Sequence, residues 1–441
     1  MDESPPVLFF SKRLLVAVTI FVSFINFQLL KNNISICIVE MLSNRTTTGR
    51  PDFDWNAATI GIILSSSSYG GFLSFVSGFL VHKLGGSTNA SLCMLISGLT
   101  TLIQPLALHL DLWSFLLCRF VTGIFESFFY ASTADIAAHW FPRNERSMLI
   151  SFSFNGANVG TAIVYPFCGY ISYNFGWKNT FYITGAISVI VSIMCYIFVR
   201  NHPCEDKWIS KEELEYICDG TDTNSEENLH HPYQSILTSK AVISLYLLVF
   251  AYMWIDSIFV TFLPLYIRDH TQNQNVDEIG LLALIPNLVF VFVVPLAGFL
   301  INFWDNKDTT TFTQICKIVT SFACMVSIIT LIAIALISSF TIKMILIVII
   351  ETAMAFLSLV LQFVPFKLYP DSSSFIFGFI IAVFSISAVL SQNVMSLIVT
   401  NHTVQEWNFC FVVSCGILLL AAVVFEKFGS CEKVETHSEK K

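Results

Sequence analysis

Charged side chains are scarce in this chain. Asp, Glu, Lys and Arg make up 12% of its 441 residues, whereas hydrophobic residues make up 55% and phenylalanine alone occurs 42 times. Soluble domains carry about 25% charged residues, and the mean hydropathy of this chain is +0.70. The composition excludes an ordinary soluble domain and predicts an integral membrane protein surrounded by a lipid bilayer.

Other scarce features exclude further classes of protein. The net charge of −8 comes from acids gathered mainly in one hydrophilic segment, so nucleic acid is not an expected partner. The twelve cysteines include no C-x-x-C pair and no Cys/His ligand spacing, so we expect neither a disulfide framework nor a metal site. Because no nucleophile and base stand in one accessible place, we expect no enzyme, no catalytic residue and no cofactor.

Long apolar runs are abundant instead. A helix that spans a bilayer needs about 20 mainly apolar residues, and twelve runs meet this criterion. They are residues 14–42, 59–81, 90–110, 112–138, 148–172, 178–199, 241–268, 279–303, 312–338, 342–366, 374–399 and 407–427. The first run follows Lys12 and Arg13 and is too long for a signal peptide, so we expect it to remain as the first helix.

The distribution of Lys and Arg predicts the orientation in the membrane. If both termini are cytoplasmic, sixteen of the 23 lysines and arginines lie in inner segments and five lie in outer segments. Lys31 and Arg119 remain within the membrane. Because an excess of Lys and Arg marks cytoplasmic loops, we expect both termini to be cytoplasmic.

Glycosylation sequons fall in two of the predicted outer loops. NRT begins at Asn44 and NHT begins at Asn401, and both asparagines are predicted glycosylation sites. Chance occurrence of a three-residue pattern is the alternative for each. The NAS at Asn89 falls on the predicted inner side, where chance is the better interpretation.

One hydrophilic interruption separates six runs from six. The predicted organisation is a cytoplasmic N-terminus (1–13), an N-terminal six-helix bundle (14–199), a cytoplasmic linker (200–240), a C-terminal six-helix bundle (241–427) and a cytoplasmic tail (428–441). Within the linker, ISKEELEYICDG offers Ser210 and Glu213 as a capping box and Gly220 as a stop, which predicts a short surface helix. The similar sequences GFLVHKLGG and GFLINFWDN follow the second and eighth runs. Two such halves are typical of the all-α, twelve-helix architecture of major facilitator transporters, although composition alone does not separate this architecture from other twelve-helix carriers.

The stretch from Arg119 to Gly185 resembles helices 4 to 6 of the solute carrier 17 family. That family comprises sialin, the vesicular glutamate and nucleotide transporters, and the type I phosphate transporters. The matching elements are Arg119, Gly123, Glu126, Trp140, Pro142, the ERS of 145–147, Gly156, Gly160, Pro166, Gly169, Trp177, Phe181 and Tyr182. Residues 53–70 and 201–217 fit the same family, and VFAYMW, IPN and VVPLAG extend the resemblance into the second half.

The resemblance implies an anion carrier that works by alternating access and is driven by protons, membrane potential or sodium. Several positions depart from the family pattern. Lys31, in LLKNNIS, replaces an arginine and keeps the charge without the planar fork that grips a carboxylate. Leu64 and Tyr252 replace residues of the vesicular glutamate branch, which places the sequence closer to sialin. VPFKLYP stands where the family has NHLDIAP, so no single member's substrate is transferred to this chain.

Arg119 and Glu126 are the first candidate functional residues. Seven residues apart on a helix, they share one face at about 10.5 Å along the axis. Ionisable residues inside a membrane tend to mark pathways or relays. We expect Arg119 to bind the substrate's negative charge and Glu126 to carry a proton, with a structural ion pair as the alternative.

Further candidates lie in the first, second, seventh and tenth runs, and the resemblance implies that the first, seventh and tenth line the central cavity. Lys31 and Tyr69 are candidate substrate contacts, although Tyr69 also suits plain packing. Asp256 and Glu351 are candidate additional cavity charges. Each is interpreted as a second proton site, a counter-charge for Lys31 or Arg119, a cation site, or a solvated carboxylate without a role.

The sequence therefore predicts a monomeric secondary active transporter of small anions, such as sialic acid, acidic amino acids or phosphate. The coupling ion is H⁺ or Na⁺, and the location is the plasma membrane or a lysosomal or vesicular membrane. The alternative is a transport-inactive relative that senses a ligand or serves as a scaffold.

Overall fold

The computed structural model describes residues 11–42, 53, 55–142, 145–220, 239–271, 275–305, 312–368 and 373–430, and these are helical with short connections and no strands. The first elements are α1 (Lys12–Met41), α2 (Ala57–Gly70), the 3₁₀ helix η1 (Gly71–Val76), α3 (Ser77–Leu84), α4 (Gly86–Leu110), α5 (Leu112–Trp140), α6 (Arg146–Phe175), α7 (Trp177–Phe198), η2 (Pro203–Glu205) and α8 (Lys211–Gly220). The later elements are α10 (Lys240–Thr271), α11 (Val276–Asp305), α12 (Phe312–Leu336), α13 (Phe340–Leu368), α14 (Ser373–Ile398) and α15 (Val404–Phe428).

Every predicted membrane run coincides with helical structure. Ten helices in the described ranges are long and apolar enough to cross a bilayer, and α2 and α6 are not among them. The predicted run 59–81 is divided into α2, η1 and α3, so its longest α-helical piece has 14 residues. In α6, serine and asparagine near its start lower the hydropathy. The all-helical membrane fold is confirmed.

The contacts divide the chain into two compact units. Unit 1 comprises Met1–Met41 and Ser66–Leu229, and unit 2 comprises Leu42–Ser65 and His230–Lys441. One division therefore falls inside the predicted linker, whereas another falls within α2, between Ser65 and Ser66. The first two turns of the chain's second membrane run thus belong to unit 2, and the rest of that run belongs to unit 1.

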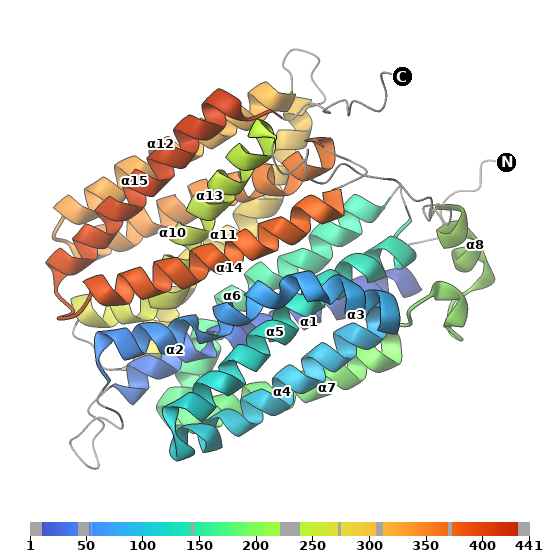
Figure 1. Cartoon of the computed structure of the whole chain (residues 1–441), viewed down its shortest axis with the longest axis horizontal. Coiled ribbons are helices and arrows are strands. Elements are labelled where there is room, and N and C mark those ends of the chain that lie inside the picture. Colours follow the sequence, from blue (N-terminus) through green and yellow to red (C-terminus); the bar gives the residue numbers. More distant parts are fainter. Residues whose placement is uncertain are drawn as a thin grey trace. The chain divides into compact units, whose positions relative to one another are not determined.

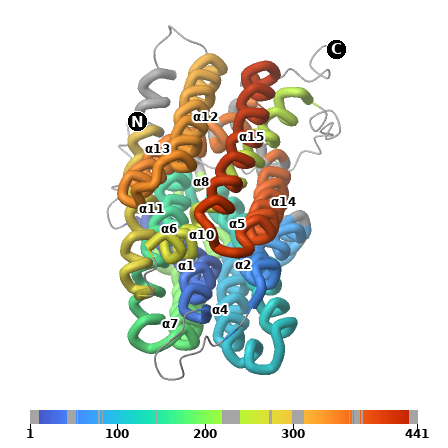
Figure 2. The backbone as a smooth tube through the Cα atoms, turned by 90° about the vertical axis from the view of Figure 1, so that its left-hand side faces the viewer, coloured from blue at the N-terminus to red at the C-terminus, as the bar shows by residue number. Residues whose placement is uncertain are grey.

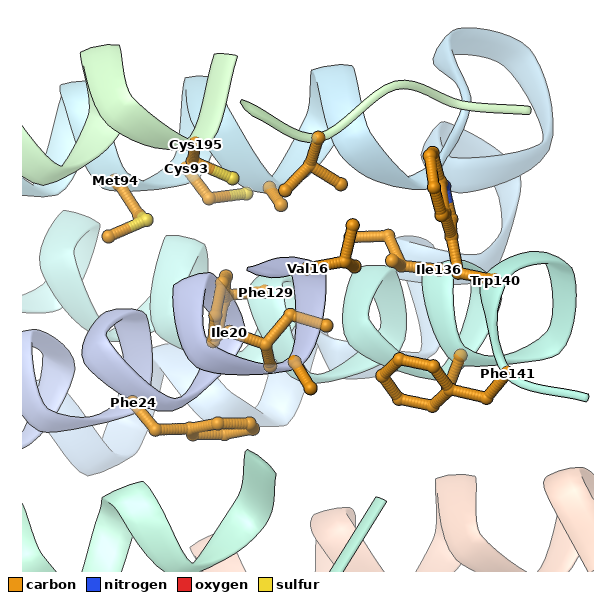
Figure 3. Close-up of a cluster of buried hydrophobic side chains, with 14 of the residues drawn as sticks. Val16, Ile20, Phe24, Cys93, Met94, Phe129, Ile136, Trp140, Phe141 and Cys195 are labelled. Atoms are coloured by element: carbon orange, nitrogen blue, oxygen red, sulfur yellow. The ribbon is translucent and has the colours of Figure 1, made fainter. Parts of the chain in front are cut away.

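In unit 1, α1 packs on α6 and α7, and α4 packs on α5 and α7 (Figure 1). Glycines allow the closest approach, as the GANVG pattern of α6 predicts. A Cβ at Gly156 would collide with the backbone carbonyl of Phe21 in α1, and one at Gly160 would meet Ile25. A hydrophobic core fills the space between α1, α4, α5 and α7; Figure 3 shows Val16, Ile20, Phe24, Cys93, Met94, Phe129, Ile136, Trp140, Phe141 and Cys195 gathered there.

In unit 2, α10 packs on α14 and α15, and α13 packs on α11 and α12. Figure 2 shows α12 and α15 side by side, as their contacts require. The outer face of α12 carries large apolar side chains every three to four residues, all of them exposed: Ile318, Phe322, Met325 and Ile329. A stripe of this kind is compatible with lipid contact and costly in water.

The linker helix α8, at the right-hand edge of Figure 1, has the predicted N-cap but only half of the predicted capping box. The hydroxyl of Ser210 accepts from the amide of Glu213 at 3.2 Å. The Glu213 carboxylate does not return to Ser210. It accepts from the backbone amides of Lys12 and Arg13 at 3.0 Å each, and so caps the first turn of α1 from 200 residues away. The first amides of a helix lack acceptors within the helix, and the helix dipole favours a negative charge beside them, which explains why the Glu213 carboxylate binds at the start of α1.

Candidate functional site

The centre of unit 1 holds an ion pair between α1 and α5. Nζ of Lys31 lies 3.0 Å from Oε1 of Glu126. The Lys31 side chain is 36% exposed, whereas the Glu126 side chain is only 9% exposed. A close backbone approach frames the pair, because a Cβ at Gly123 would collide with the carbonyl oxygen of Ser67 in α2. The backbone of α2 therefore occupies the space that a side chain at position 123 would need.

Arg119 is completely buried and bonded to α1. Its Nη1 donates to the carbonyl of Leu30 at 3.0 Å and to Oδ1 of Asn33 at 3.3 Å. Its Nη2 donates to the carbonyl of Lys31 at 2.8 Å and to the hydroxyl of Ser67 at 3.5 Å. In this conformation the guanidinium fastens α5 to α1 and α2, and the partner of Glu126 is Lys31.

Polar side chains of four helices, α1, α4, α5 and α7, lie around this pair. Nδ2 of Asn33 donates to the hydroxyl of Thr184 in α7 at 3.4 Å, so Asn33 connects Arg119 with α7. In α5, the hydroxyl of Thr122 lies 3.1 Å from that of Thr100 and accepts from Gln104 at 3.4 Å. These groups are neutral, so Lys31, Glu126 and Arg119 form the ionic part of the site.

Tyr69 lies on α2 in unit 1 and is half-buried. Its ring meets that of Phe72 edge to face, with centroids 6.0 Å apart. This contact suits the packing interpretation, and a substrate contact for Tyr69 stays a prediction.

Asp256 and Glu351 lie in unit 2, on α10 and α13, which pack together. Their carboxylates are close enough to interact electrostatically, and Tyr252 lies beside both and in hydrogen-bond contact with Ser358. Glu351 is buried and Asp256 is half-buried. The two acids predicted as separate cavity charges therefore belong to one group.

Of the two predicted glycosylation sites, the structure describes only Asn401. Asn44 lies outside the described residues. Asn401 is exposed, and its Nδ2 donates to the carboxylate of Glu406 at 2.9 Å. Within the described ranges, no group of three or more His, Cys, Asp or Glu side chains is arranged to hold a metal ion.

Sequence reasoning missed Asn33, Ser67 and Glu213 as partners of the charged residues. Asn33 follows Lys31 by two positions, and its place in N-x-S beside a membrane-embedded cation was the available signal. The backbone carbonyls that receive Arg119 leave no trace in the sequence.

The chain resembles known transporters along most of its length. The family described as Major Facilitator Superfamily matches residues 16–391. Human sialin is 25% identical over 449 residues, with 96% of this chain and 90% of sialin covered. Mouse sodium-dependent phosphate transport protein 3 is 24% identical, with 90% and 84% covered, and zebrafish (Danio rerio) vesicular glutamate transporter 3 is 23% identical, with 91% and 70% covered.

Solved structures share the fold. A bacterial homolog of the human lysosomal transporter Spinster, in an inward-facing and occupied conformation, matches with a TM-score of 0.72 at 15% identity, covering 94% of this chain and 96% of the other. A D-xylose-proton symporter also matches with a TM-score of 0.72, at 14% identity and with 95% and 100% covered. The chain therefore belongs to the Major Facilitator Superfamily, and its predicted resemblance to the solute carrier 17 branch is confirmed.

Proposed function

We propose that this protein is a secondary active transporter of small anions, in which the Lys31–Glu126 pair receives the substrate. The observation that carries the proposal is the pair's asymmetry: the cation is partly exposed while the carboxylate is buried. An anion approaching the site meets the ammonium group first. The similarity to sialin and to phosphate and glutamate transporters supports a carboxylate or phosphate as its charged part.

Coupling to protons follows from competition for Lys31. When a substrate anion occupies the ammonium group, Glu126 loses its partner at a buried position. A buried carboxylate without a direct ion-pair partner is costly, and taking up a proton removes that cost. Anion binding and proton binding at this site are therefore linked and must favour each other equally. Sodium as the coupling ion is the competing outcome.

Arg119 has a different task in this proposal. With four donor contacts to α1 and α2, it holds Lys31 in place, and the direct contact with substrate falls to Lys31. A separate role is proposed for Asp256 and Glu351, a second protonation site in unit 2, because two neighbouring carboxylates share a proton more readily than they stay doubly charged.

The proposed topology has both termini in the cytoplasm, in the plasma membrane or a lysosomal or vesicular membrane. Glycosidase treatment of protein from an animal cell line tests the outer position of the loop with Asn44. We expect part of the mobility shift to be lost in Asn44→Gln and part in Asn401→Gln, and none to be lost in Asn89→Gln. A glycan at Asn89 would reverse the topology.

The deciding experiment is uptake by the purified full-length chain in liposomes. Labelled sialic acid, glutamate, aspartate and phosphate are offered under an imposed pH gradient, sodium gradient or membrane potential. We expect one of these anions to accumulate with the pH gradient and Lys31→Ala to abolish its uptake. Lys83→Ala, which removes an exposed cation from the same unit, serves as the control.

The alternative of a transport-inactive relative is decided by the same assay. If no anion of the panel accumulates under any gradient, although one of them protects the folded protein against heat in a Lys31-dependent way, the chain is a sensor. Arg119→Ala separates the two roles of the cations: it should lower the melting temperature, whereas Lys31→Ala should mainly remove substrate binding.

A further inference from the structure

A second cluster of ionisable side chains lies at one end of unit 2. Its members are Arg268, Asp269 and His270 in the last turn of α10, Lys343 in the first turn of α13, and His402 in the loop between α14 and α15. We call it the Asp269 cluster. The transport mechanism proposed above uses none of these residues.

Asp269 is the acceptor that Arg268 and His402 of the cluster share. Its Oδ1 accepts from Nε and Nη2 of Arg268 at 3.3 and 3.0 Å. Its Oδ2 accepts from Nε1 of Trp407 at 3.2 Å and lies 2.9 Å from Nδ1 of His402. Arg268 and Trp407 can only donate to this carboxylate, and His402 donates to it when Nδ1 carries a hydrogen.

His402 joins the α14–α15 loop to this carboxylate. Its backbone has a φ of 56°, a conformation uncommon for a residue with a side chain, so the loop depends on contacts that hold it there. The Glu406 carboxylate supplies some, by accepting from the amides of Asn401 and Thr403 at 3.0 and 3.2 Å. The His402 side chain is 30% exposed and can exchange a proton with water. A proton on His402 adds a positive charge beside Asp269 and strengthens the contact.

His270, in contrast to His402, makes contacts that require a neutral ring. Its Nδ1 lies 3.0 Å from the carbonyl oxygen of Tyr266, which can only accept, so Nδ1 carries a hydrogen. Its Nε2 lies 3.2 Å from Nζ of Lys343, whose ammonium group can only donate. His270 must therefore be neutral, with its lone pair on Nε2. Lys343 is 1% exposed, so water does not screen it.

Protonation of His270 would place two cations 3.2 Å apart and remove the acceptor of the buried ammonium group. The other charged neighbour of His270 is Asp269, whose four contacts are already made by Arg268, Trp407 and His402. Separating the first turn of α13 from α10 relieves this repulsion.

We propose that the Asp269 cluster is a pH-responsive switch with two opposite arms. Acidification charges His402, which tightens the α14–α15 loop on α10, and charges His270, which releases the first turn of α13 from α10. The helix that is released, α13, is the one that carries Glu351. The switch stands independently of the proposed transport function, because the cluster shares no residue with the Lys31–Glu126 pair.

Hydrogen–deuterium exchange of the full chain in lipid nanodiscs tests the switch without a substrate. Exchange is compared at about pH 7.5 and about pH 4.5, after correction for the intrinsic rate. The lower value lies well below the ordinary titration range of histidine because Lys343 opposes protonation of His270. On acidification we expect exchange of residues 343–347 to rise by about fivefold or more and that of residues 403–407 to fall. Opposite signs distinguish the switch from general acid loosening.

The variants assign each arm. His270→Gln keeps a donor and an acceptor but cannot become charged, so it should abolish the change at 343–347 and leave that at 403–407. His402→Gln should do the reverse. His109→Gln, which alters an exposed histidine of unit 1, should change neither. Lys343→Leu should also remove the α13 response, because no buried cation then opposes protonated His270.

Equal exchange at the two pH values in the wild-type chain would overturn the proposal, whatever the variants do. So would changes of the same sign in both segments, or a full α13 response in His270→Gln.

Discussion

The ammonium group of Lys31 and the carboxylate of Glu126 lie 3.0 Å apart although 95 positions separate them in the chain. Arg119 also extends from α5 to α1. Its guanidinium group donates to the backbone carbonyls of Leu30 and Lys31 and to the side chains of Asn33 and Ser67. Two membrane-embedded cations thus have separate tasks. One pairs with a titratable acid and is partly exposed, and the other is fully enclosed by helix contacts.

Glu126→Gln should separate coupling from binding. The amide cannot carry a proton between states, so accumulation of the anion against its gradient should be lost. Exchange of labelled for unlabelled substrate should survive, because Lys31 remains. Counterflow and net uptake in liposomes measure the two separately. Glu426→Gln, at an exposed carboxylate of α15, is the control, and undiminished pH-driven accumulation in Glu126→Gln would place the proton elsewhere.

The Lys31–Glu126 pair should appear as a coupling energy. Removing one partner of a fully buried pair costs about 3–5 kcal/mol, but the exposure of Lys31 should reduce this to about 1–2 kcal/mol. We expect Lys31→Ala and Glu126→Ala each to destabilise the protein more than the double variant does. Denaturation in detergent measures the cycle, and strictly additive losses would show that the pair contributes nothing.

The hypothesis that Asp256 or Glu351 compensates Lys31 is tested in parallel. Because Asp256 and Glu351 interact with each other, we expect the cycle of Lys31→Ala with Glu351→Ala to be additive. The cycle of Asp256→Asn with Glu351→Gln should show coupling, since each change relieves the repulsion of the same two carboxylates. A non-additive cycle for Lys31 and Glu351 would instead support Glu351 as the counter-charge of Lys31.

Gly123→Ala should destabilise unit 1. Its Cβ would collide with the carbonyl oxygen of Ser67, and backbone atoms cannot turn aside. We expect a loss of about 1–3 kcal/mol, the usual cost of overpacking. Gly416→Ala in α15 meets nothing within 4 Å and should be neutral or stabilising by up to about 1 kcal/mol, as glycine is a poor helix former. Melting temperatures that shift alike would argue against the close approach of α2 and α5.

Glu213→Ala should loosen the start of α1. It removes both acceptors from the amides of Lys12 and Arg13, and loss of a helix cap costs about 0.5–2 kcal/mol. Glu212→Ala changes an exposed neighbour in the same helix and should be nearly silent. Proteolysis near residue 12, followed over time in both variants, reports the loosening. Equal resistance would mean that α8 stabilises α1 by other contacts.

Much of the fold was predictable because it depends on local composition. The run from 241 to 268 spans a membrane whatever lies beside it, since some twenty apolar residues in a row must leave water. Arg119, Glu126 and Lys31 were recognisable for the same reason, because a charge inside such a run is costly enough to imply a purpose. The short helix after Ser210 was also readable from its cap.

Tertiary structure alone decided the partners. Spacing places Arg119 and Glu126 on one face of a helix, but it does not reveal that Lys31 pairs with Glu126 or that backbone carbonyls receive Arg119. The same holds for Glu213, whose local capping pattern predicted a bond to its own helix, whereas the start of α1 offered two amides. Hydropathy is a property of consecutive residues. Pairing depends on how far each helix is rotated and shifted against its neighbours, and that is set by packing between residues distant in sequence, at contacts such as Gly123 with Ser67.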